Sequence, residues 1–491
     1  MSALLPLLQG AAEAAGEFAP KAVGEVFGPR ALLTQAGYVA ASVCFMLGLK
    51  ALTKPETARR GIRLAAVGML LAVLGTLIVA EIVEYQWILG GLLVGAAIGY
   101  PLGTRVPMTA MPQRIAIALT FGASAATMVG VAEYLHRSGA AAGAMPRAQA
   151  AALGFEVLLG CITITGSLVA FGKLHEILPG RPLTFGGQNL VNAAAMLGAL
   201  ALLGILVADP AAAWAFWAMA ALALVIGASF VLPIGGADMP VVVSLLNSYA
   251  GLAACATGFA IGNTVLIIAG ALDGASGFIL SIIMSKAMNR SFANVLFGAF
   301  GGGAAAGGAK SAAGLTVKSL TAEDAAIQLG YAGKVIVVPG YGMAVAQAQH
   351  VVRELAELIE KKGGEVKYAI HPVAGRMPGH MNVLLAEANV PYDRMYEMEE
   401  INDEFSTADV ALVIGANDVV NPAARSDPAS PIYGMPILDA DRAKSVIVMK
   451  RGMSAGFAGI ENELFYADNT RMLFGDAKQT LTKLVTEVKS I

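Results

Sequence analysis

The chain has 491 residues, of which 56% are hydrophobic and only 14% are charged. Soluble globular proteins have about a quarter of their residues charged, so this composition excludes an ordinary soluble protein as a description of the whole chain. The formal net charge is −2 and there is no basic stripe, so the sequence predicts no nucleic-acid partner.

Residues 1–30 are apolar in patches, which prolines, glycines and glutamates interrupt. A signal peptide needs a basic beginning and a continuous apolar core, and this segment has neither. We therefore predict an extracytoplasmic amphipathic lead-in over residues 1–30.

The apolar excess lies before residue 290, where nine stretches each approach the roughly 20 residues that cross a bilayer. We predict a multi-span α-helical membrane domain of about nine helices over residues 31–290. The predicted spans are 33–51, 63–82, 86–104, 115–133, 151–172, 189–208, 213–232, 241–261 and 264–285.

Basic residues gather at alternate ends of these spans. Cytoplasmic loops carry the excess of lysine and arginine, so these ends are expected in the cytoplasm. Because the number of spans is odd, the N-terminus then lies outside and residues 290–491 lie in the cytoplasm. The basic residues are Lys50, Lys54, Arg59, Arg60, Arg63, Arg105, Arg114, Lys173, Arg181, Lys286 and Arg290.

The three cysteines, Cys44, Cys161 and Cys255, all fall within predicted spans. Without a CxxC motif or a cluster of cysteine and histidine, the sequence supports neither a disulfide framework nor a zinc site. We predict that they are small buried apolar residues, and we predict no metal site.

Several polar side chains lie in or beside the predicted spans, where a charge is costly and usually lines a polar pathway. Asp238 stands at the mouth of the span 241–261, and Ser244, Asn247 and Ser248 share one face of that helix. Helix–helix hydrogen bonding is the alternative, which we favour for Thr163 and Ser167, whereas we favour a functional role for Asp238 and Asn247. The other polar residues of this group are Glu156, Thr165, Tyr249, Asn263 and Asp273.

A run of glycine and alanine over 301–314 predicts a flexible linker, within a segment 291–320 that joins the membrane domain to the rest. From Thr321 the pattern changes to alternating strands and helices. Thr321 and Asp324 resemble a capping box that opens a short helix.

The alternation predicts a six-stranded α/β doubly wound, Rossmann-like domain over 321–491, which binds ligands outside the carboxyl ends of its strands. A final helix is expected near 476–489. The predicted strands are 334–338, 366–371, 394–398, 409–415, 435–439 and 445–450.

A glycine turn follows the first of these strands. Gly340 and Gly342 precede a predicted amphipathic helix over 343–362, which Gly363 and Gly364 end. Strand, turn and helix would place backbone N–H groups where a pyrophosphate can be held. The motif is incomplete, because Val345 stands where a third glycine or alanine is usual.

The loops after the other strands favour NADP over NAD. An NAD site has an acid about 20 residues beyond the glycines, and here that loop carries Arg376 instead. Lys450 and Arg451 add positive charge that suits a 2′-phosphate, although solvated basic residues remain an alternative. We favour structural roles for His371 and His380, because hydride transfer between nicotinamides needs no protein acid or base.

Several blocks of sequence are specific enough to show a resemblance. They are 339–347 (PGYGMAVAQ), 373–380 (VAGRMPGH), 415–418 (GAND), 475–478 (GDAK), 235–244 (GGADMPVVVS) and 286–291 (KAMNRS). Together they resemble the β subunit of proton-translocating NAD(P) transhydrogenases, over roughly residues 33–491.

That resemblance implies a membrane domain that conducts protons and a cytoplasmic domain that binds NADP(H). A separate α subunit binds NAD(H), and hydride passes directly between the two nicotinamides (Re/Si-specific) while a proton crosses the membrane. It further implies an enzyme that is active only with its NAD-binding partner, assembled as a dimer of αβ units in the bacterial inner membrane.

The resemblance also implies which residues do the work, with no catalytic side chain. The proton path that we predict from the polar residues of the spans runs through Asp238, Asn247, Glu156 and Ser244. The resemblance concerns the nucleotide. It holds the nucleotide inverted relative to an ordinary Rossmann site, with the 2′-phosphate on Lys450 and Arg451. The implied NADP(H) contacts are Gly340, Tyr341, Gly342, Met343, Ala344, Val345, Val373, Ala374, Gly375, Arg376, Met377, Pro378, Gly379, Gly415, Ala416, Asn417, Asp418, Val419, Gly434, Met435, Lys450, Arg451, Gly452, Gly456, Phe457, Ala458, Asp476 and Ala477.

Three positions depart from the family pattern. Gly452 stands where a serine is frequent, and Phe457 replaces a frequent tyrosine. Leu119 stands where many members have a membrane histidine, and leucine cannot carry a proton. Either a partner helix supplies the relay group, or the path relies on Asp238, Asn247 and water.

A second class of function stays open on the sequence. The chain could be a channel or transporter gated by a cytoplasmic NADP-sensing domain. A selectivity filter would need a run of backbone carbonyls like TVGYG, and the sequence has no such run.

Overall fold

The computed structural model describes residues 29–78, 85–105, 110–138, 145–179, 183–235, 238–287, 316–375, 379–428, 430, 432–454 and 460–491. The lead-in predicted for 1–30 lies outside these residues except for its last two, and so does the glycine–alanine run 301–314. Asp238 is described, but its neighbours 236 and 237 are not.

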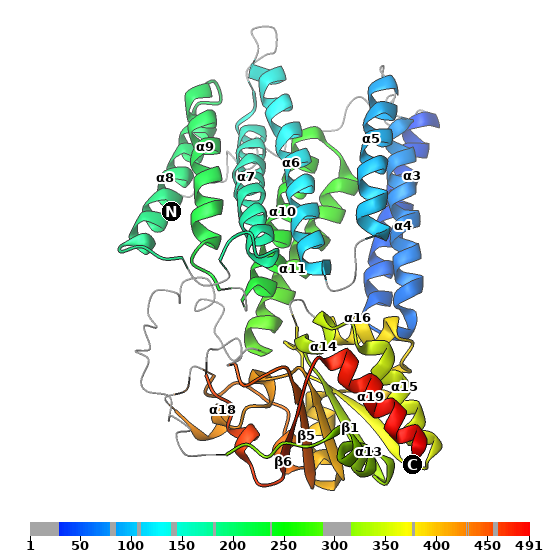
Figure 1. Ribbon diagram of the computed structural model, residues 1–491. Coiled ribbons are helices and arrows are strands. Elements are labelled where there is room, and N and C mark those ends of the chain that lie inside the picture. The colour runs from blue at the N-terminus through cyan, green and yellow to red at the C-terminus, as the bar shows by residue number, and fades with distance from the viewer. Residues whose placement is uncertain are drawn as a thin grey trace, which may run out of the picture.

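Within the described residues, nine helices are long and apolar enough to cross a membrane, which confirms the predicted number. They run side by side, and the sheet domain lies at one end of the bundle (Figure 1). The helices are α3 (Pro29–Leu52), α4 (Pro55–Leu77), α5 (Tyr85–Thr104), α6 (Met111–Ser138), α7 (Arg147–Leu174), α8 (Gln188–Ala208), α9 (Ala213–Val231), α10 (Met239–Ile261) and α11 (Thr264–Ala287).

The helices α6 and α7 extend beyond the spans predicted from hydropathy, because polar side chains at their ends bond to neighbouring helices. The Gln113 amide donates to the Leu174 carbonyl oxygen at 2.9 Å, and the Gln149 amide donates to the Ala260 carbonyl oxygen at 2.7 Å. A hydropathy window excludes such residues, although they lie within the helices.

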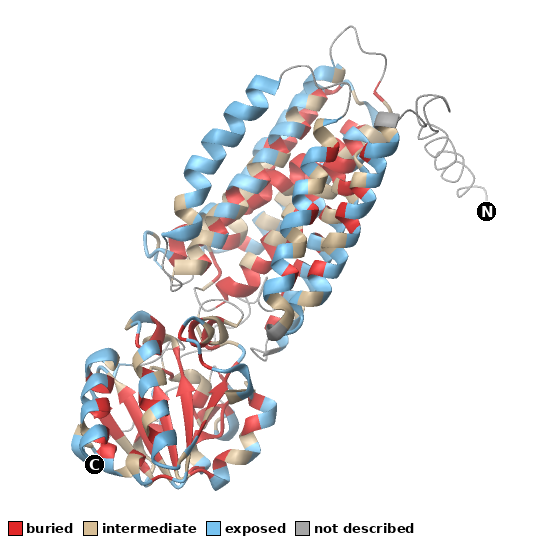
Figure 2. Ribbon diagram, turned by 90° about the vertical axis from the view of Figure 1, so that its right-hand side faces the viewer, coloured by how far each residue is buried: buried red, intermediate tan, exposed pale blue. Residues whose placement is uncertain are grey.

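Helix α7 lies at the centre of the bundle, and most of its residues are buried. Its neighbours approach closely because glycines stand at the contacts: a Cβ at Gly160 would lie 2.1 Å from Thr127 Oγ1, and one at Gly227 would lie 2.2 Å from the Ile162 oxygen. Helix α5, by contrast, has no buried residue. Figure 2 shows this division between a buried centre and exposed outer helices.

The C-terminal domain is a six-stranded parallel sheet with the strand order β3-β2-β1-β4-β5-β6. This order is that of a Rossmann fold, as predicted. The strands are β1 (Lys334–Pro339), β2 (Glu365–Ile370), β3 (Met395–Glu397), β4 (Val410–Ile414), β5 (Ser445–Lys450) and β6 (Thr470–Phe474).

Both faces of the sheet are buried, which explains the continuous β-branched run in β1. Val335 and Val337 face one hydrophobic core, and Ile336 and Val338 face the other. The first core lies under α13 (Ala322–Gly330), α15 (Gln349–Lys361), α16 (His380–Glu387) and α19 (Ala477–Ser490). The second lies under shorter helices, including α17 (Met398–Ile401), η4 (Asn402–Thr407) and η7 (Glu463–Tyr466).

The predicted first and last helices of this domain are both present. Thr321 caps α13 by accepting a hydrogen bond from the Asp324 backbone N–H at 3.1 Å. Asp476 caps α19, which matches the predicted final helix.

One predicted strand is wrong and another strand was missed. Residues 435–439 form no strand: Pro436 has no N–H to donate, and the Leu438 N–H donates instead to the Val419 oxygen in a loop. The sixth strand is β6, whose five residues carry no strong alternation and include Arg471.

The helix predicted over 343–362 is also wrong, because the chain forms two helices there. The short helix α14 (Tyr341–Val345) ends before Gln347, whose φ of 48° breaks the helical path, and α15 begins at Gln349. The predicted end is correct, since Gly363 follows α15 with a φ of 95°.

Candidate nucleotide-binding site and membrane path

The loops that follow β1 and β4 meet at the carboxyl edge of the sheet, where the strand order reverses direction. A doubly wound sheet binds its ligand in the crevice at this point. Gly340 and Gly342 come from the first loop, and Gly415, with a φ of 64°, comes from the second. The structure therefore brings together three of the predicted glycines.

These glycines are needed because the two backbones touch. A Cβ at Gly340 would lie 2.4 Å from the Ala416 nitrogen, and one at Gly415 would lie 2.4 Å from the Gly342 Cα. The Gly342 N–H donates to the Gly415 oxygen at 2.9 Å, and the Gly340 N–H donates to the Ile414 oxygen at 2.9 Å. Any side chain at these positions would push the two loops apart.

The same bonds change the interpretation of the glycine turn. The N–H groups of Gly340, Gly342 and Met343 all donate to protein carbonyls, and α14 has only five residues. They are not directed at a pyrophosphate in the way that an ordinary Rossmann turn directs them. The glycines serve the contact between loops.

Lys450 is the last residue of the neighbouring strand β5 and Arg451 follows it, but the surroundings of the two side chains differ. The Lys450 ammonium donates to the carbonyl oxygens of Gly452, at 3.0 Å, and Ser454, which shapes the segment after the strand. Burial lowers its pKa, and the nearby Asp418 carboxylate opposes that effect. Arg451 is exposed and available to an anion.

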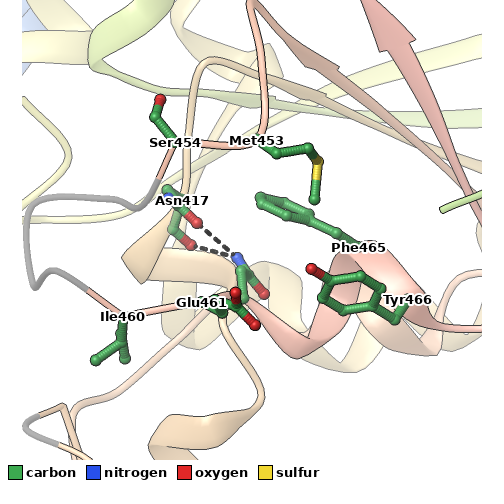
Figure 3. Close-up of a pocket in the computed structure, with 8 residues that line it drawn as sticks. Asn417, Met453, Ser454, Ile460, Glu461, Phe465 and Tyr466 are labelled. Carbon is green, nitrogen blue, oxygen red and sulfur yellow. Dashed lines mark hydrogen bonds between the residues drawn. The ribbon is translucent and has the colours of Figure 1, made fainter. Parts of the chain in front are cut away.

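A small cavity lies between the turn after β4 and the segment before η7 (Figure 3). Asn462, which is almost fully buried, donates to both the backbone oxygen and the side-chain oxygen of Asn417, at 3.0 and 2.9 Å. Its own oxygen accepts from the Leu464 N–H. The lining residues are Asn417, Met453, Ser454, Ile460, Glu461, Asn462, Phe465 and Tyr466.

Sequence reasoning missed Asn462. Its neighbours form no recognisable motif, and the residue that it positions lies far away in the chain. Asn421 makes a matching bond in the other direction, from its amide to the Glu461 oxygen at 3.0 Å. Two buried asparagines therefore join the same two segments.

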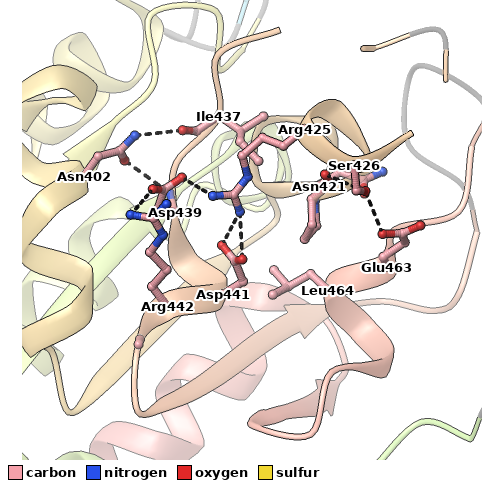
Figure 4. A network of polar contacts seen from close by, with 12 residues as sticks. Asn402, Asn421, Arg425, Ser426, Ile437, Asp439, Asp441, Arg442, Glu463 and Leu464 are labelled. Carbon is pink, nitrogen blue, oxygen red and sulfur yellow. Dashed lines mark hydrogen bonds and ion pairs between the residues drawn. The ribbon is translucent and has the colours of Figure 1, made fainter. Parts of the chain in front are cut away.

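The predicted residues Gly434 and Met435 lie in a loop that an ionic network fixes (Figure 4). Arg425 bonds Asp439 at 2.8 Å and Asp441 through both carboxylate oxygens at 2.7 Å. Asn402 binds the same loop through the Ile437 oxygen. Gly434 itself has a φ of 77° and its N–H donates to Ala424.

The geometry around His371 favours the structural role. Its Nε2 lies 2.8 Å from the Pro436 oxygen, while Nδ1 accepts from the Val373 N–H at 3.3 Å. Only the neutral ring with the proton on Nε2 satisfies both bonds. Burial lowers the pKa of His371 to about 4, and the bond to Pro436 partly offsets this.

Other predicted contacts have different surroundings. Val373 packs against Val241 of α10 and Met284 of α11, at the end of the membrane bundle. Asp476 is occupied as the cap of α19, although it lies beside the end of β5. Arg376, Met377, Pro378, Gly456, Phe457 and Ala458 lie outside the described residues.

In the membrane, Ser244, Asn247 and Ser248 all face α11, as their spacing predicted. Ser244 donates to the Gly277 oxygen at 2.9 Å, Ser248 donates to the Gly274 oxygen at 2.7 Å, and Asn247 donates to the carboxylate of Asp273 at 3.0 Å. The two hydroxyls therefore serve helix packing.

The two predicted acids lie apart in the bundle. Asp238 precedes α10, but its side chain does not cap that helix. Glu156 is fully buried in α7, where Gly130 leaves room for its carboxyl group: a Cβ there would lie 2.8 Å from Glu156 Cδ.

Two comparisons bear on identity. The family described as NAD(P) transhydrogenase beta subunit matches residues 34–487. Two relatives named NAD(P) transhydrogenase subunit beta, both from Rhodospirillum rubrum and one assigned to a named strain, are each 52% identical over 459 residues, which is 92% of this chain and 98% of the relative.

The chain belongs to the NAD(P) transhydrogenase β-subunit family.

This membership confirms the predicted resemblance and agrees with a multi-pass membrane protein that ends in a Rossmann-like domain. In this transhydrogenase chain, Leu119 packs on a cluster that includes Met239, Val242 and Leu246. The Leu119 side chain therefore packs on apolar side chains of α10.

Proposed function

We propose that this chain binds NADP(H) at the carboxyl edge of its sheet and receives hydride from NADH held by a partner α subunit. The bound nucleotide supplies the hydride-accepting ring, and the protein supplies position and exclusion of water. The membrane domain couples this transfer to the movement of a proton. The enzyme works in the bacterial inner membrane as a dimer of αβ units, with the N-terminus outside and the NADP domain in the cytoplasm.

The observation that carries this proposal is the contact between the loops of β1 and β4 beside Lys450 and Arg451. Dinucleotides bind at the carboxyl edge of a doubly wound sheet where the strand order reverses, and the exposed guanidinium at the end of β5 suits a 2′-phosphate. Because the N–H groups of Gly340 and Gly342 are occupied, the geometry also supports a nucleotide held in the inverted orientation.

The proposed proton path uses Asp238 at the start of α10, Asn247 about two and a half turns further along that helix, and Glu156 on α7. Acids inside a membrane bundle are costly and mark such pathways. Ser244 belongs to the path only as a neighbour, since its hydroxyl is bonded to α11.

Partner dependence tests the function. Direct transfer needs two nicotinamides in contact, at about 3–3.5 Å, and this chain offers one site. We expect no NADH-to-NADP transhydrogenation from the purified chain, and full activity after addition of the NAD-binding subunit. Full turnover by this chain alone would refute the proposal, and ion flux gated by NADP without hydride transfer would favour the channel alternative.

A further inference from the structure

Asp273 lies deep in the membrane domain and outside the path proposed above. It is nine residues after the start of α11 and fourteen before its end, which places it about 14 Å and about 20 Å from the two ends of the helix. An aspartate side chain is too short to reach water from this depth. Its carboxylate is exposed on the surface of this chain and accepts a hydrogen bond from Asn247.

The pairing with Asn247 is fixed by the packing of two helices. A Cβ at Gly251 would lie 2.4 Å from the Gly274 nitrogen, and one at Gly270 would lie 2.4 Å from the Cys255 nitrogen. The hydroxyls of Ser244 and Ser248 bond across the same contact. Helices α10 and α11 therefore touch along their backbones, which keeps the side chains of Asp273 and Asn247 within reach of each other.

We propose that Asp273 is the titratable group of the membrane proton path, a role that the leucine at position 119 cannot fill. This inference rests on the proposed function. A proton arriving from the side of Asn247 binds a carboxylate oxygen of Asp273 and converts it to the neutral acid. The same proton then leaves toward the opposite side, so one proton is moved and the carboxylate is restored. Asn247 positions the carboxylate by donating a hydrogen bond to it from its side-chain amide.

A merely structural role makes the opposite prediction. Asparagine at position 273 has the size of aspartate and can still bond the Asn247 amide, so Asp273→Asn would preserve the helix contact. A relay role requires ionisation, which Asp273→Asn removes and Asp273→Glu retains.

The experiment uses the complete enzyme, this chain with its NAD-binding partner, reconstituted in vesicles that report proton uptake. For Asp273→Asn we expect coupled transhydrogenation and proton uptake to fall at least about tenfold, with Asp273→Glu recovering much of both. Asp209→Asn, the same change at an exposed turn after α8, is the matched control and should behave as wild type. Unchanged proton uptake in Asp273→Asn would overturn the inference.

A second measurement needs no variant. Dicyclohexylcarbodiimide reacts with protonated carboxyl groups in apolar surroundings, and mass spectrometry identifies the residue modified. We expect Asp273 to be modified in step with the loss of proton uptake, whereas full modification with normal uptake would refute its role. If the wild-type enzyme moves no protons, the proposed function fails instead.

Discussion

Lys450 and Arg451 are adjacent, and their environments assign them different tasks. Lys450 is held by the carbonyls of its own loop, so its charge organises the segment that follows β5. Arg451 is exposed, so its guanidinium is accessible to a ligand. The sequence placed both on the 2′-phosphate and could not distinguish them, because the difference arises from loop geometry.

Arg451→Ala should therefore weaken NADP binding roughly tenfold or more, the value of a charge-assisted contact of about 1.5–3 kcal/mol. NAD binding should hardly change, because NAD has no 2′-phosphate. Calorimetry with both nucleotides measures the difference. Arg471→Ala is the control and should leave binding unchanged, because Arg471 lies near the start of β6, away from the carboxyl edge of the sheet. An equal loss for NADP and NAD would contradict the assignment.

His371 should make the sheet domain less stable in mild acid. Its pKa is about 4 in the folded domain, against about 6.5 in the unfolded chain. Below pH 6.5 the unfolded state binds a proton that the folded state does not, so the free energy of unfolding falls as the pH drops toward 4, by about 3 kcal/mol in total.

Urea unfolding of residues 316–491 at about pH 7.5 and about pH 5 measures this loss. The fragment contains both hydrophobic cores of the sheet domain, so it can be studied alone. His371→Asn should reduce the pH dependence, and His350→Gln, on an exposed position of α15, should leave it unchanged. A pH dependence that survives His371→Asn would show that other groups cause it.

Among the elements, those defined by a single local property were predicted from the sequence. Length and hydropathy alone identify nine membrane helices, and β-branched runs identify β1 and β4. The errors occur where tertiary contacts determine which structure a segment adopts. The predicted strand 435–439 begins with four apolar residues, but Asn402 and Val419 take up its backbone groups in place of a neighbouring strand.

The break between α14 and α15 is another feature that no local signal in the sequence predicts. Gln347 has a good helix propensity and yet adopts a φ of 48°, which costs a non-glycine residue about 1–2 kcal/mol. The contact of the β1 and β4 loops holds the start of α14, where the Gly342 N–H donates to the Gly415 oxygen.

Gln347→Gly should consequently raise the free energy of unfolding by up to about 1 kcal/mol, because glycine adopts this φ without strain. The same substitution in the first turn of a regular helix, Gln479→Gly in α19, should lower it, by up to about 1 kcal/mol. Chemical denaturation of the two variants tests the pair. An equal loss of unfolding free energy in both variants would mean that the backbone at Gln347 is not strained.

At the scale of the whole molecule, the site is assembled from loops far apart in the sequence and from the end of the membrane bundle. The sequence predicted the loops individually. It could not show that Val373, expected to contact the nucleotide, packs on Val241 of α10 and Met284 of α11. Asp238 begins the same helix α10, three residues before Val241.

Asp238→Asn should therefore reduce proton pumping and forward transhydrogenation steeply, because it removes ionisation at the end of the helix that contacts the sheet domain. NADP binding to residues 316–491 should be unaffected, as that fragment lacks Asp238. Reconstituted vesicles measure the first effect and calorimetry the second. Normal pumping by the variant would show that the charge of Asp238 is not used.

The contact of Val373 with Val241 and Met284 also describes a place where a small molecule could act. Val373 packs against Val241 near the start of α10 and Met284 near the end of α11, two helices whose backbones touch. A compact apolar compound that took the place of Val373 would separate the sheet domain from both helices at once. We expect such a compound to uncouple hydride transfer from proton movement and also to disturb nucleotide binding, because Val373 is a predicted nucleotide contact.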